Sequence, residues 1–322
     1  MATASIYRVD SQQGRYDDDK VREAISLAQS VESNRTATVV FSARYYHLTA
    51  PLIIAGNVSL VSDGAGRRAT TLRFERGLNP GVDLVHFQGG FGNVISNMSI
   101  ETPAGVQQTA ANVSCLRLNN VSSFTAENLE LQGKDLGPNS SGVLVEGRES
   151  VVIRDFNATA SRGIVVDSGD NIRVYNFDIQ VSGSVRGDDA TGTQAKLAGI
   201  QGTKSFAGNF VQFSHGTIQR GEHAVYIDSN VAVAGGSLVL QDVRYEQGLI
   251  DQNRSNAAWH VRIRRDKGHG FERLIMRGCR NSPRESPATH LSGASGYTID
   301  TGNVFHSTSP HGPHIGAKPK PA

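Results

Sequence analysis

The sequence predicts an all-β protein whose chain winds as a single-stranded parallel β-helix, with an α-helix capping its N-terminal end. The first observation is a set of short apolar segments that begin at regular intervals. Six of them start at Val85, Leu116, Val143, Ile164, Ile200 and Val225, and Leu249-Ile250 makes a seventh. The steps between the six are 31, 27, 21, 36 and 25 residues, a mean of 28 per coil. A fixed period of this size with strand-like alternation is typical of a solenoid.

A second phrase recurs between the apolar segments and contains a characteristic asparagine or aspartate. It occupies residues 93–100, 123–131, 150–156, 171–179 and 237–243, with Asn97, Asn128, Asp155, Asn176 and Asp242 at that position. These side chains tolerate a left-handed backbone and therefore suit a bend that ends a strand. Because they would stack coil upon coil, they can also hydrogen-bond to one another, and we interpret them as structural. Three strands of about 3–5 residues each, plus turns, would fill one coil.

A large β-sandwich is the alternative interpretation of the same repeats. Sandwich strands are longer and are joined by hairpin turns. Asn-Gly and Asp-Gly turns flanked by strands are almost absent from this chain. The β-helix is therefore the better explanation, and it makes the 322 residues one long domain rather than two.

The composition excludes several classes of protein. A formal net charge of +2 gives no support to binding of nucleic acid or of an anionic membrane surface. The chain has no apolar run of 18 residues and no basic segment followed by an apolar one at its N-terminus, so we expect a soluble protein without a signal peptide. Cys115 and Cys279 lie far apart in sequence and are predicted to be free, buried thiols.

Residues 1–37 are predicted to form an irregular lead-in and the N-terminal capping helix. Three aspartates begin the helical segment 17–31, which reads as an N-capped helix with acidic residues in its first turn. One apolar stripe follows at helical spacing: Val21, Ala24, Ile25, Ala28 and Val31. The open end of a solenoid exposes its core and needs a cover, which this helix would provide.

Residues 38–280 are predicted to form the β-helix itself. Its first coils would use strands at residues 38–41, 46–48, 51–54, 58–61 and 71–74. Residues 281–322 are rich in Pro, Ser, His and Gly and hold one strand-like phrase, 297–300. We expect a C-terminal cap there, followed by a flexible Pro/His/Lys tail. The tail histidines lack Cys or acidic partners, so a solvated tail is favoured over a metal cluster.

The order of the first segments resembles the opening of the pectate-lyase-like superfamily, which includes phage tailspike depolymerases, polygalacturonases, polysaccharide lyases and epimerases. The resemblance rests on the helix, then Thr-Val-Val-Phe at 38–41, Pro-Leu-Ile-Ile at 51–54 and Ser-Asp-Gly-Ala-Gly at 62–66. It covers residues 17–75 through these motifs and residues 82–250 through coil periodicity alone. The family's usual Pro-x-Gly-x-Tyr is replaced by Ser-Ala-Arg-Tyr-Tyr at 42–46.

This resemblance implies a right-handed β-helix, most like tailspike and depolymerase domains, and a polysaccharide as the partner. Tailspike-like proteins are commonly homotrimers, so a homotrimer is one option, although no coiled-coil heptads occur in this chain. A virion tail and the cytoplasm are the two candidate locations.

Alternation along the first strand of each coil sorts its side chains into an inner and an outer face. Three carboxylates fall on one outward stripe: Glu146, Asp167 and Asp228. With coils about 4.8 Å apart, Glu146 and Asp167 would be about 5 Å apart, and Asp167 and Asp228 about 10 Å apart. Such separations suit the acid, base or nucleophile of a glycosidase, so these three are the predicted catalytic residues. Simple solvation of acidic strand ends is the alternative.

Residues near this stripe are the predicted substrate-binding residues. Arg117, Gln201 and Tyr226 share the outward positions, and His223 stands just before a first strand in Gly-Glu-His-Ala. The longest insertion, residues 182–197, should bulge beside the same face and carries Asp188, Asp189 and Lys196. The two aspartates could bind Ca²⁺ or act as acid and base. No other metal or cofactor is predicted.

The leading functional prediction is an enzyme that binds a polysaccharide along the outer β-helix face and hydrolyses one glycosidic bond with paired carboxylates. A non-catalytic β-helix that serves as a structural spike or glycan adhesin is the first alternative. Low aromatic content favours it, since Trp259 is the only tryptophan. A polyuronate lyase or epimerase is the second alternative, with its base and cations drawn from several coils.

Overall fold

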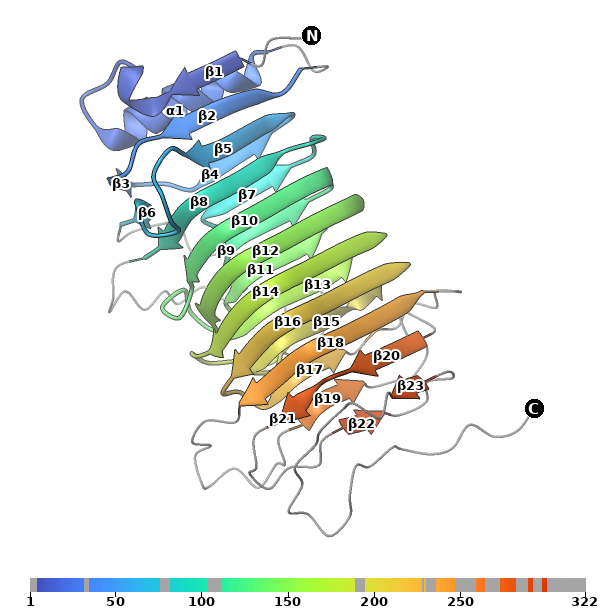
Figure 1. Cartoon of the computed structure of the whole chain (residues 1–322). Helices are drawn as coiled ribbons and strands as arrows, with labels where there is room; N and C mark the ends of the chain where they lie inside the picture. Colours follow the sequence, from blue (N-terminus) through green and yellow to red (C-terminus); the bar gives the residue numbers. More distant parts are fainter. Residues whose placement is uncertain are drawn as a thin grey trace.

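The computed structural model describes residues 5–31, 35–75, 82–102, 112–188, 195–227, 229, 236–246, 259–263, 273–281, 289–291 and 297–299. The fold is a right-handed parallel β-helix, as predicted, with coils stacked along one axis from α1 to the last strands (Figure 1). All strand pairs between successive coils are parallel, and they assemble two sheets. Within the described residues the large sheet has 14 strands and the small sheet has nine.

The large sheet consists of β1 (Ser5–Arg8), β2 (Ala37–Phe41), β3 (Tyr45–Leu48), β5 (Val58–Ser62), β6 (Thr70–Phe74), β8 (Val94–Glu101), β10 (Ser122–Gln132), β12 (Glu149–Ala160), β14 (Asn171–Val181), β16 (Phe210–Gln219), β18 (Ser237–Glu246), β20 (Arg273–Arg277), β21 (Arg280–Asn281) and β23 (Tyr297–Ile299). The small sheet consists of β4 (Leu52–Ala55), β7 (Val85–Gln88), β9 (Ser114–Asn119), β11 (Ser141–Glu146), β13 (Arg162–Ser168), β15 (Ala198–Ala207), β17 (His223–Ile227), β19 (Trp259–Ile263) and β22 (Thr289–Leu291).

The small sheet confirms the predicted period. The six apolar residues that begin the repeats follow one another in register from β7 to β17. The predicted seventh segment, Leu249-Ile250, lies outside the described residues. The next strand in this sheet is instead β19, where Val261 pairs with Val225.

The large sheet differs from the prediction in one respect, because the expected second and third strands of each coil are fused. From β8 to β18 each strand runs for 8–12 residues and bends in its middle at a residue with left-handed backbone, and β10 and β12 have a second such residue near their start, Ser123 and Ser150. The five predicted bend residues all have φ between 50° and 59°. In β16 the bend falls on His215, with φ 54°, which a search for Asn or Asp does not detect.

The bend residues form the predicted side-chain ladder in part. Asn128 Nδ2 donates to Asn97 Oδ1 at 2.7 Å, and Asn176 Nδ2 donates to Asp155 Oδ1 at 3.0 Å. His215 Nδ1 lies 3.4 Å from Asp242 Oδ2. These contacts tie neighbouring coils together at the corner where the backbone conformation is least favourable for other residues.

The interior between the sheets is apolar along its length. Phe156, Phe177 and Phe213 pack in sequence, with ring centroids 6.1 Å and 6.3 Å apart. Gly216 pairs with Phe177 in the sheet, and a Cβ there would lie 2.2 Å from the Phe177 ring, so the glycine makes room for the aromatic side chain. Cys115 and Cys279 are buried thiols that form no disulfide among the described residues, as predicted, and burial raises the pKa of the Cys279 thiol to about 11.

The N-terminal end is covered by α1 (Asp17–Gln29), as predicted. Val21, Ala24, Ile25 and Ala28 are buried, and Val31 packs at the edge of the core. The predicted N-cap is wrong, because Tyr16 occupies that position without a side-chain cap hydrogen bond. The lead-in is also more regular than expected: β1 pairs with β2, and η1 (Val9–Ser11) follows it. No helix among the described residues is long and apolar enough to span a bilayer.

Candidate functional site

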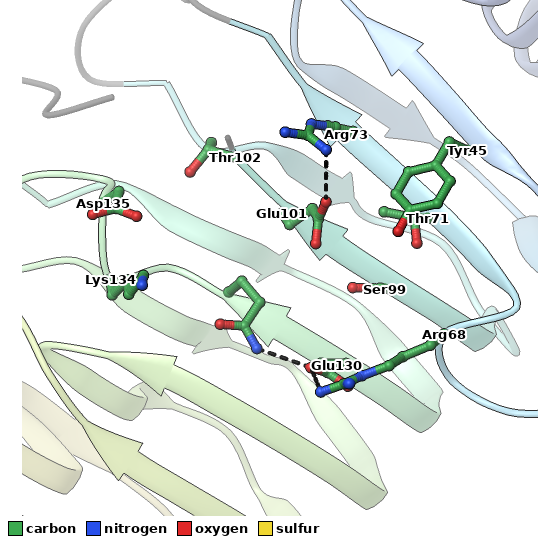
Figure 2. Close-up of a pocket in the computed structure, with 11 residues that line it drawn as sticks. Tyr45, Arg68, Thr71, Arg73, Ser99, Glu101, Thr102, Glu130, Lys134 and Asp135 are labelled. Atoms are coloured by element: carbon green, nitrogen blue, oxygen red, sulfur yellow. Dashed lines mark hydrogen bonds and ion pairs between the residues drawn. The ribbon is translucent and has the colours of Figure 1, made fainter. Parts of the chain in front are cut away.

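A polar pocket of about 400 Å³ opens on the outer face of the large sheet (Figure 2). It lies where β6, β8 and β10 run side by side after the bend, between Tyr45 of β3 and the turn that follows β10. Its lining is Tyr45, Arg68, Thr71, Arg73, Ser99, Glu101, Thr102, Glu130, Gln132, Lys134 and Asp135. None of these side chains is aliphatic, so the pocket suits a ligand rich in hydroxyl or charged groups.

Strand alternation produces this polar lining. Leu72, Ile100 and Leu131 point inward and are fully buried, so the residues on either side of each point outward. Parallel register then aligns two outward rows across the three strands. One row is Thr71, Ser99 and Glu130, and the other is Arg73, Glu101 and Gln132.

Glu130 forms the floor of the pocket and is held by two neighbours. Arg68 binds it through two hydrogen bonds, Nε to Oε2 at 2.5 Å and Nη2 to Oε1 at 2.6 Å, and Gln132 Nε2 donates to Oε1 at 2.9 Å. Burial would raise the pKa of Glu130, but these hydrogen bonds and the charges of Arg68 and Arg67 outweigh it and lower the pKa. Glu130 is therefore an ionised anchor that pins the β5–β6 loop to β10 across two coils.

Glu101 and Asp135 are the two remaining carboxylates of the pocket (Figure 2). Glu101 Oε1 lies 3.8 Å from Arg73 Nη1, a loose ion pair, and its side chain is 25% exposed. Asp135 makes no side-chain hydrogen bond or ion pair with any other residue that the structure describes. Both carboxylates are thus available to a ligand, and acid–base chemistry on a bound sugar requires such a pair.

Cations and one aromatic ring surround these carboxylates. Arg73 and Lys134 line the pocket, and Arg68 is largely exposed at its rim. Tyr45 is 54% exposed and presents its ring to solvent beside Thr71 (Figure 2). An exposed tyrosine offers an apolar ring and a polar hydroxyl together, which is suited to packing against a sugar.

The predicted catalytic residue Glu146 lies on the other sheet and has strong protein partners. Arg117 binds its carboxylate at both oxygens, with Nε to Oε2 at 2.7 Å and Nη2 to Oε1 at 3.0 Å. Asn119 Nδ2 adds a third hydrogen bond at 2.8 Å, and Arg117 also reaches Asp83 at 3.2 Å. The structure therefore brings the predicted residues Arg117 and Glu146 together, but as a salt bridge within the protein.

Asp167 occupies a β-bulge next to Glu146. The register pairs Glu146 with Ser168, which leaves Asp167 as the extra residue. Its carboxylate accepts a hydrogen bond from Thr203 Oγ1 in the following coil. Asp228 lies outside the described residues. The row of three carboxylates stays a prediction. Of its two described members, Glu146 binds Arg117 in the preceding coil and Asp167 binds Thr203 in the following coil.

The predicted substrate-binding residues Gln201, Tyr226 and His223 are not on an open surface. Gln201 and Tyr226 have no exposed area and His223 is 2% exposed, so the expected solvent exposure of the first two is wrong. Alternation does place Gln201 beside Tyr226 in register. Lys196 N lies 3.4 Å from Gln201 Oε1, and the His223 ring stacks on Tyr226 at 5.2 Å, so neighbouring segments cover this part of the strand face.

The first part of the predicted insertion, residues 182–188, packs against an earlier coil, and residues 189–194 lie outside the described residues. Asn139 N donates to Ser184 O, and the Asn139 side chain bonds both the carbonyl and the amide of Arg186. Asp188 is exposed, and Asp189 lies outside the described residues. Among the described residues no three His, Cys, Asp or Glu side chains are grouped as a metal site would require.

The pocket residues were missed in the sequence analysis, although a signal for them exists. The predicted site residues come from alternation along the first strand of each coil, whereas the pocket lies on the segment after the bend. There the outward positions of β8 and β10 carry Ser99, Glu101, Glu130 and Gln132. Alternation cannot predict the position of the β5–β6 loop at the edge of the pocket, because that position depends on the contact of Arg68 with Glu130 two coils away.

Comparison with known proteins rests on structure alone. No protein-family model matches the chain, and no curated protein matches its sequence. Among solved structures, the Dettilon tailspike protein superposes with a TM-score of 0.52 at 12% identity, covering 95% of this chain and 69% of that one. Pectin methylesterase from Aspergillus niger gives a TM-score of 0.52 at 12% identity, covering 100% and 92%.

These matched structures share the parallel β-helix fold of this chain. Another match is ORF18 of Geobacillus virus E2, with a TM-score of 0.54 at 12% identity. The superposition covers 94% of this chain but only 59% of that protein, so the chain spans well under two thirds of its length. Endo-xylogalacturonan hydrolase from Aspergillus tubingensis matches with a TM-score of 0.51 at 11% identity, covering 94% and 93%. At these identities the likeness establishes the fold.

Proposed function

We propose that this protein binds a polysaccharide on the outer face of its large sheet and hydrolyses a glycosidic bond in the pocket of Figure 2. The observation that carries the proposal is that two available carboxylates, Glu101 and Asp135, line one open polar pocket. One would protonate the leaving oxygen, and the other would activate water or attack the sugar.

Two further observations support a carbohydrate substrate. The solved structures of the same fold include a pectin methylesterase, a xylogalacturonan hydrolase and a tailspike protein. The pocket also combines the exposed ring of Tyr45 with hydroxyl, amide and charged side chains, which can bond the many hydroxyl groups of a sugar.

The pocket is a better location for this chemistry than the predicted row on the small sheet. Glu146 accepts three hydrogen bonds within the protein, and breaking its pairing with Arg117 would leave that partly buried cation with Asp83 as its remaining described carboxylate partner. Glu101 has a single contact at 3.8 Å and Asp135 has none among the described side chains. An alternative catalytic site for the same reaction is therefore the predicted row of Glu146, Asp167 and Asp228.

A polyuronate lyase is the second candidate function, and the cations of the pocket favour it. Arg73 and Lys134 face the same space, with Arg68 at its rim. A uronate carboxylate could be neutralised by such cations, and Tyr45 or Lys134 could remove the proton from the adjacent carbon. This reaction would leave an unsaturated sugar instead of consuming water.

The experiment is a panel of bacterial capsular polysaccharides, xylan and polyuronates incubated with the protein. New reducing ends without ultraviolet absorbance indicate hydrolysis, and reducing ends with absorbance of an unsaturated product indicate elimination. Glu101→Gln and Asp135→Asn should each lower the hydrolytic rate at least about 100-fold, as expected for loss of a general acid or base.

The matched controls are Glu146→Gln and Asp167→Asn. They change the same chemical groups on the small sheet, and we expect activity to remain within about threefold of the wild type once thermal unfolding shows that each variant is folded. If activity survives in the pocket variants and disappears in the controls, the rival row is the catalytic one. Binding without any cleavage would instead identify a glycan adhesin or structural spike.

A further inference from the structure

A second polar surface continues from the pocket along the large sheet. After the bend, the outward residues of β12, β14 and β16 form two rows in register, which we call the polar track. It consists of Asn157, Thr159, Asp178, Gln180, Thr217 and Gln219. The buried residues between them, Ala158, Ile179 and Ile218, fix which side chains face outward.

The polar track is continuous with the pocket. Asn157 pairs with Glu130, and Thr159 pairs with Gln132. At the other end Thr217 pairs with Arg244, and the Arg244–Glu246 ion pair at 2.8 Å terminates the rows. From β10 to β18 this is four strand spacings, or about 19 Å along the axis.

None of the six side chains of the polar track makes a hydrogen bond to another residue that the structure describes. The same strands before the bend behave differently. There Arg154 binds Glu127 of the preceding coil, and Gln212 binds Ser214 of the same strand. At the bend itself Asn176 binds Asp155 of the preceding coil. The contrast means that the donors and acceptors of the track are left for solvent or a ligand, while polar groups at and before the bend bind one another.

The chemistry of the polar track matches uncharged, hydroxyl-rich units. Amides and threonine hydroxyls donate and accept at once, as sugar hydroxyls do. Five of the six side chains are half-buried, so less conformational freedom is lost when a ligand orders them. The sixth, Asp178, is exposed and is the only charged member.

One further donor belongs to the loop between β5 and β6. Arg67 Nη1 is buried and has no hydrogen-bond partner among the described residues. Its positive charge acts to lower the pKa of both Glu130 and Asp178. A buried donor without an acceptor is costly unless a ligand supplies one.

We infer that the polar track binds the neutral sugars that flank the cleaved unit of a linear polysaccharide, with the polymer running along the β-helix axis. This inference rests on the proposed function because the track is continuous with the pocket. It adds the substrate class, a chain with several consecutive uncharged sugars, and it implies cleavage within the chain rather than at its end.

The test is biolayer interferometry of the full-length protein on immobilised xylan, dextran and galactomannan. Gln180→Ala with Gln219→Ala removes two amides of the track. Gln212→Ala with Gln241→Ala removes two amides from the same outer face before the bend. We expect wild-type binding to at least one neutral polymer, a Kd raised at least about tenfold in the track variant, and a Kd within about twofold of the wild type in the control.

The inference is overturned if no neutral polymer binds the wild type, or if the track variant binds as tightly as the control variant. Its failure is distinguishable from failure of the proposed function. Glu101→Gln with Asp135→Asn should abolish cleavage and leave binding to the neutral polymer in place. Binding that depends on the track in a protein that cleaves nothing would retain the track and reject the catalytic pocket.

Discussion

Single residues at the bend show how far sequence chemistry determines this structure. Asn97, Asn128, Asp155 and Asn176 adopt left-handed backbone because their short polar side chains make that conformation less costly, and this was predictable. His215 adopts the same conformation in the same row, although its side chain gives a weaker local signal. The left-handed conformation of His215 follows from the neighbouring strands β14 and β18, which bend at the same point and so impose the bend on β16.

Asn128 should be a measurable contributor to stability. Asn128→Ala places a Cβ-bearing residue without a polar side chain at φ 51° and removes the hydrogen bond to Asn97. We expect the free energy of unfolding to fall by about 2–3 kcal/mol in urea titrations. Asn128→Gly keeps the backbone conformation accessible and should lose only about 1 kcal/mol. Equal losses in the two variants would refute the role of left-handed strain.

Glu130 should make stability depend on pH in the acid range. Its pKa is lowered in the folded state from the usual 4.5, so its pairing with Arg68 stabilises the fold above pH 4.5. This contribution is lost as pH falls through the lowered pKa. We expect Glu130→Gln to be less stable than the wild type at pH 7, with the difference shrinking toward pH 3.

The measurement for Glu130 is urea unfolding of both proteins between pH 3 and pH 7. Glu149→Gln, on the exposed start of β12, controls for the loss of one negative charge. A difference between the wild type and Glu130→Gln that stays constant down to pH 3 would contradict the assignment of a lowered pKa.

At the scale of elements, periodicity predicted the strands and the helix well. The strands of the first coils, the register of the small sheet and α1 follow from apolar spacing alone. Two features could not be obtained that way. The fused strands depend on a single-residue bend, after which strand pairing resumes in the same register. The path of residues 182–188 depends on Asn139, which is 47 residues from Arg186.

The cap helix offers a test of element-level packing. Ile25 is 5% exposed against the first coil, and Leu27 on the same helix is 39% exposed. Ile25→Ala should lower the free energy of unfolding by about 2–4 kcal/mol, and Leu27→Ala by less than about 0.5 kcal/mol. Urea unfolding monitored by circular dichroism measures both. Similar losses would mean that α1 does not seal the core.

At the scale of the whole molecule, the β-helix presents two outer faces with different use of their polar groups. The small sheet pairs Arg117 with Glu146 and buries Gln201 and Tyr226. The large sheet after the bend holds the pocket, and the side chains of its polar track have no hydrogen-bond partner in the part of the chain that the structure describes. Alternation identified outward positions correctly, but it could not predict which of them neighbouring segments cover. The carboxylate row on the small sheet and the pocket on the large sheet are therefore two separate predictions for the catalytic site.

A crystal structure with a bound oligosaccharide from a polymer that the protein cleaves or binds tests the central claim most directly. We predict density for the sugar chain over β8, β10, β12 and β14 after the bend, with one sugar in contact with Glu101 and Asp135. Sugars bound instead over β11, β13 and β15, beside Glu146 and Asp167, would contradict the account.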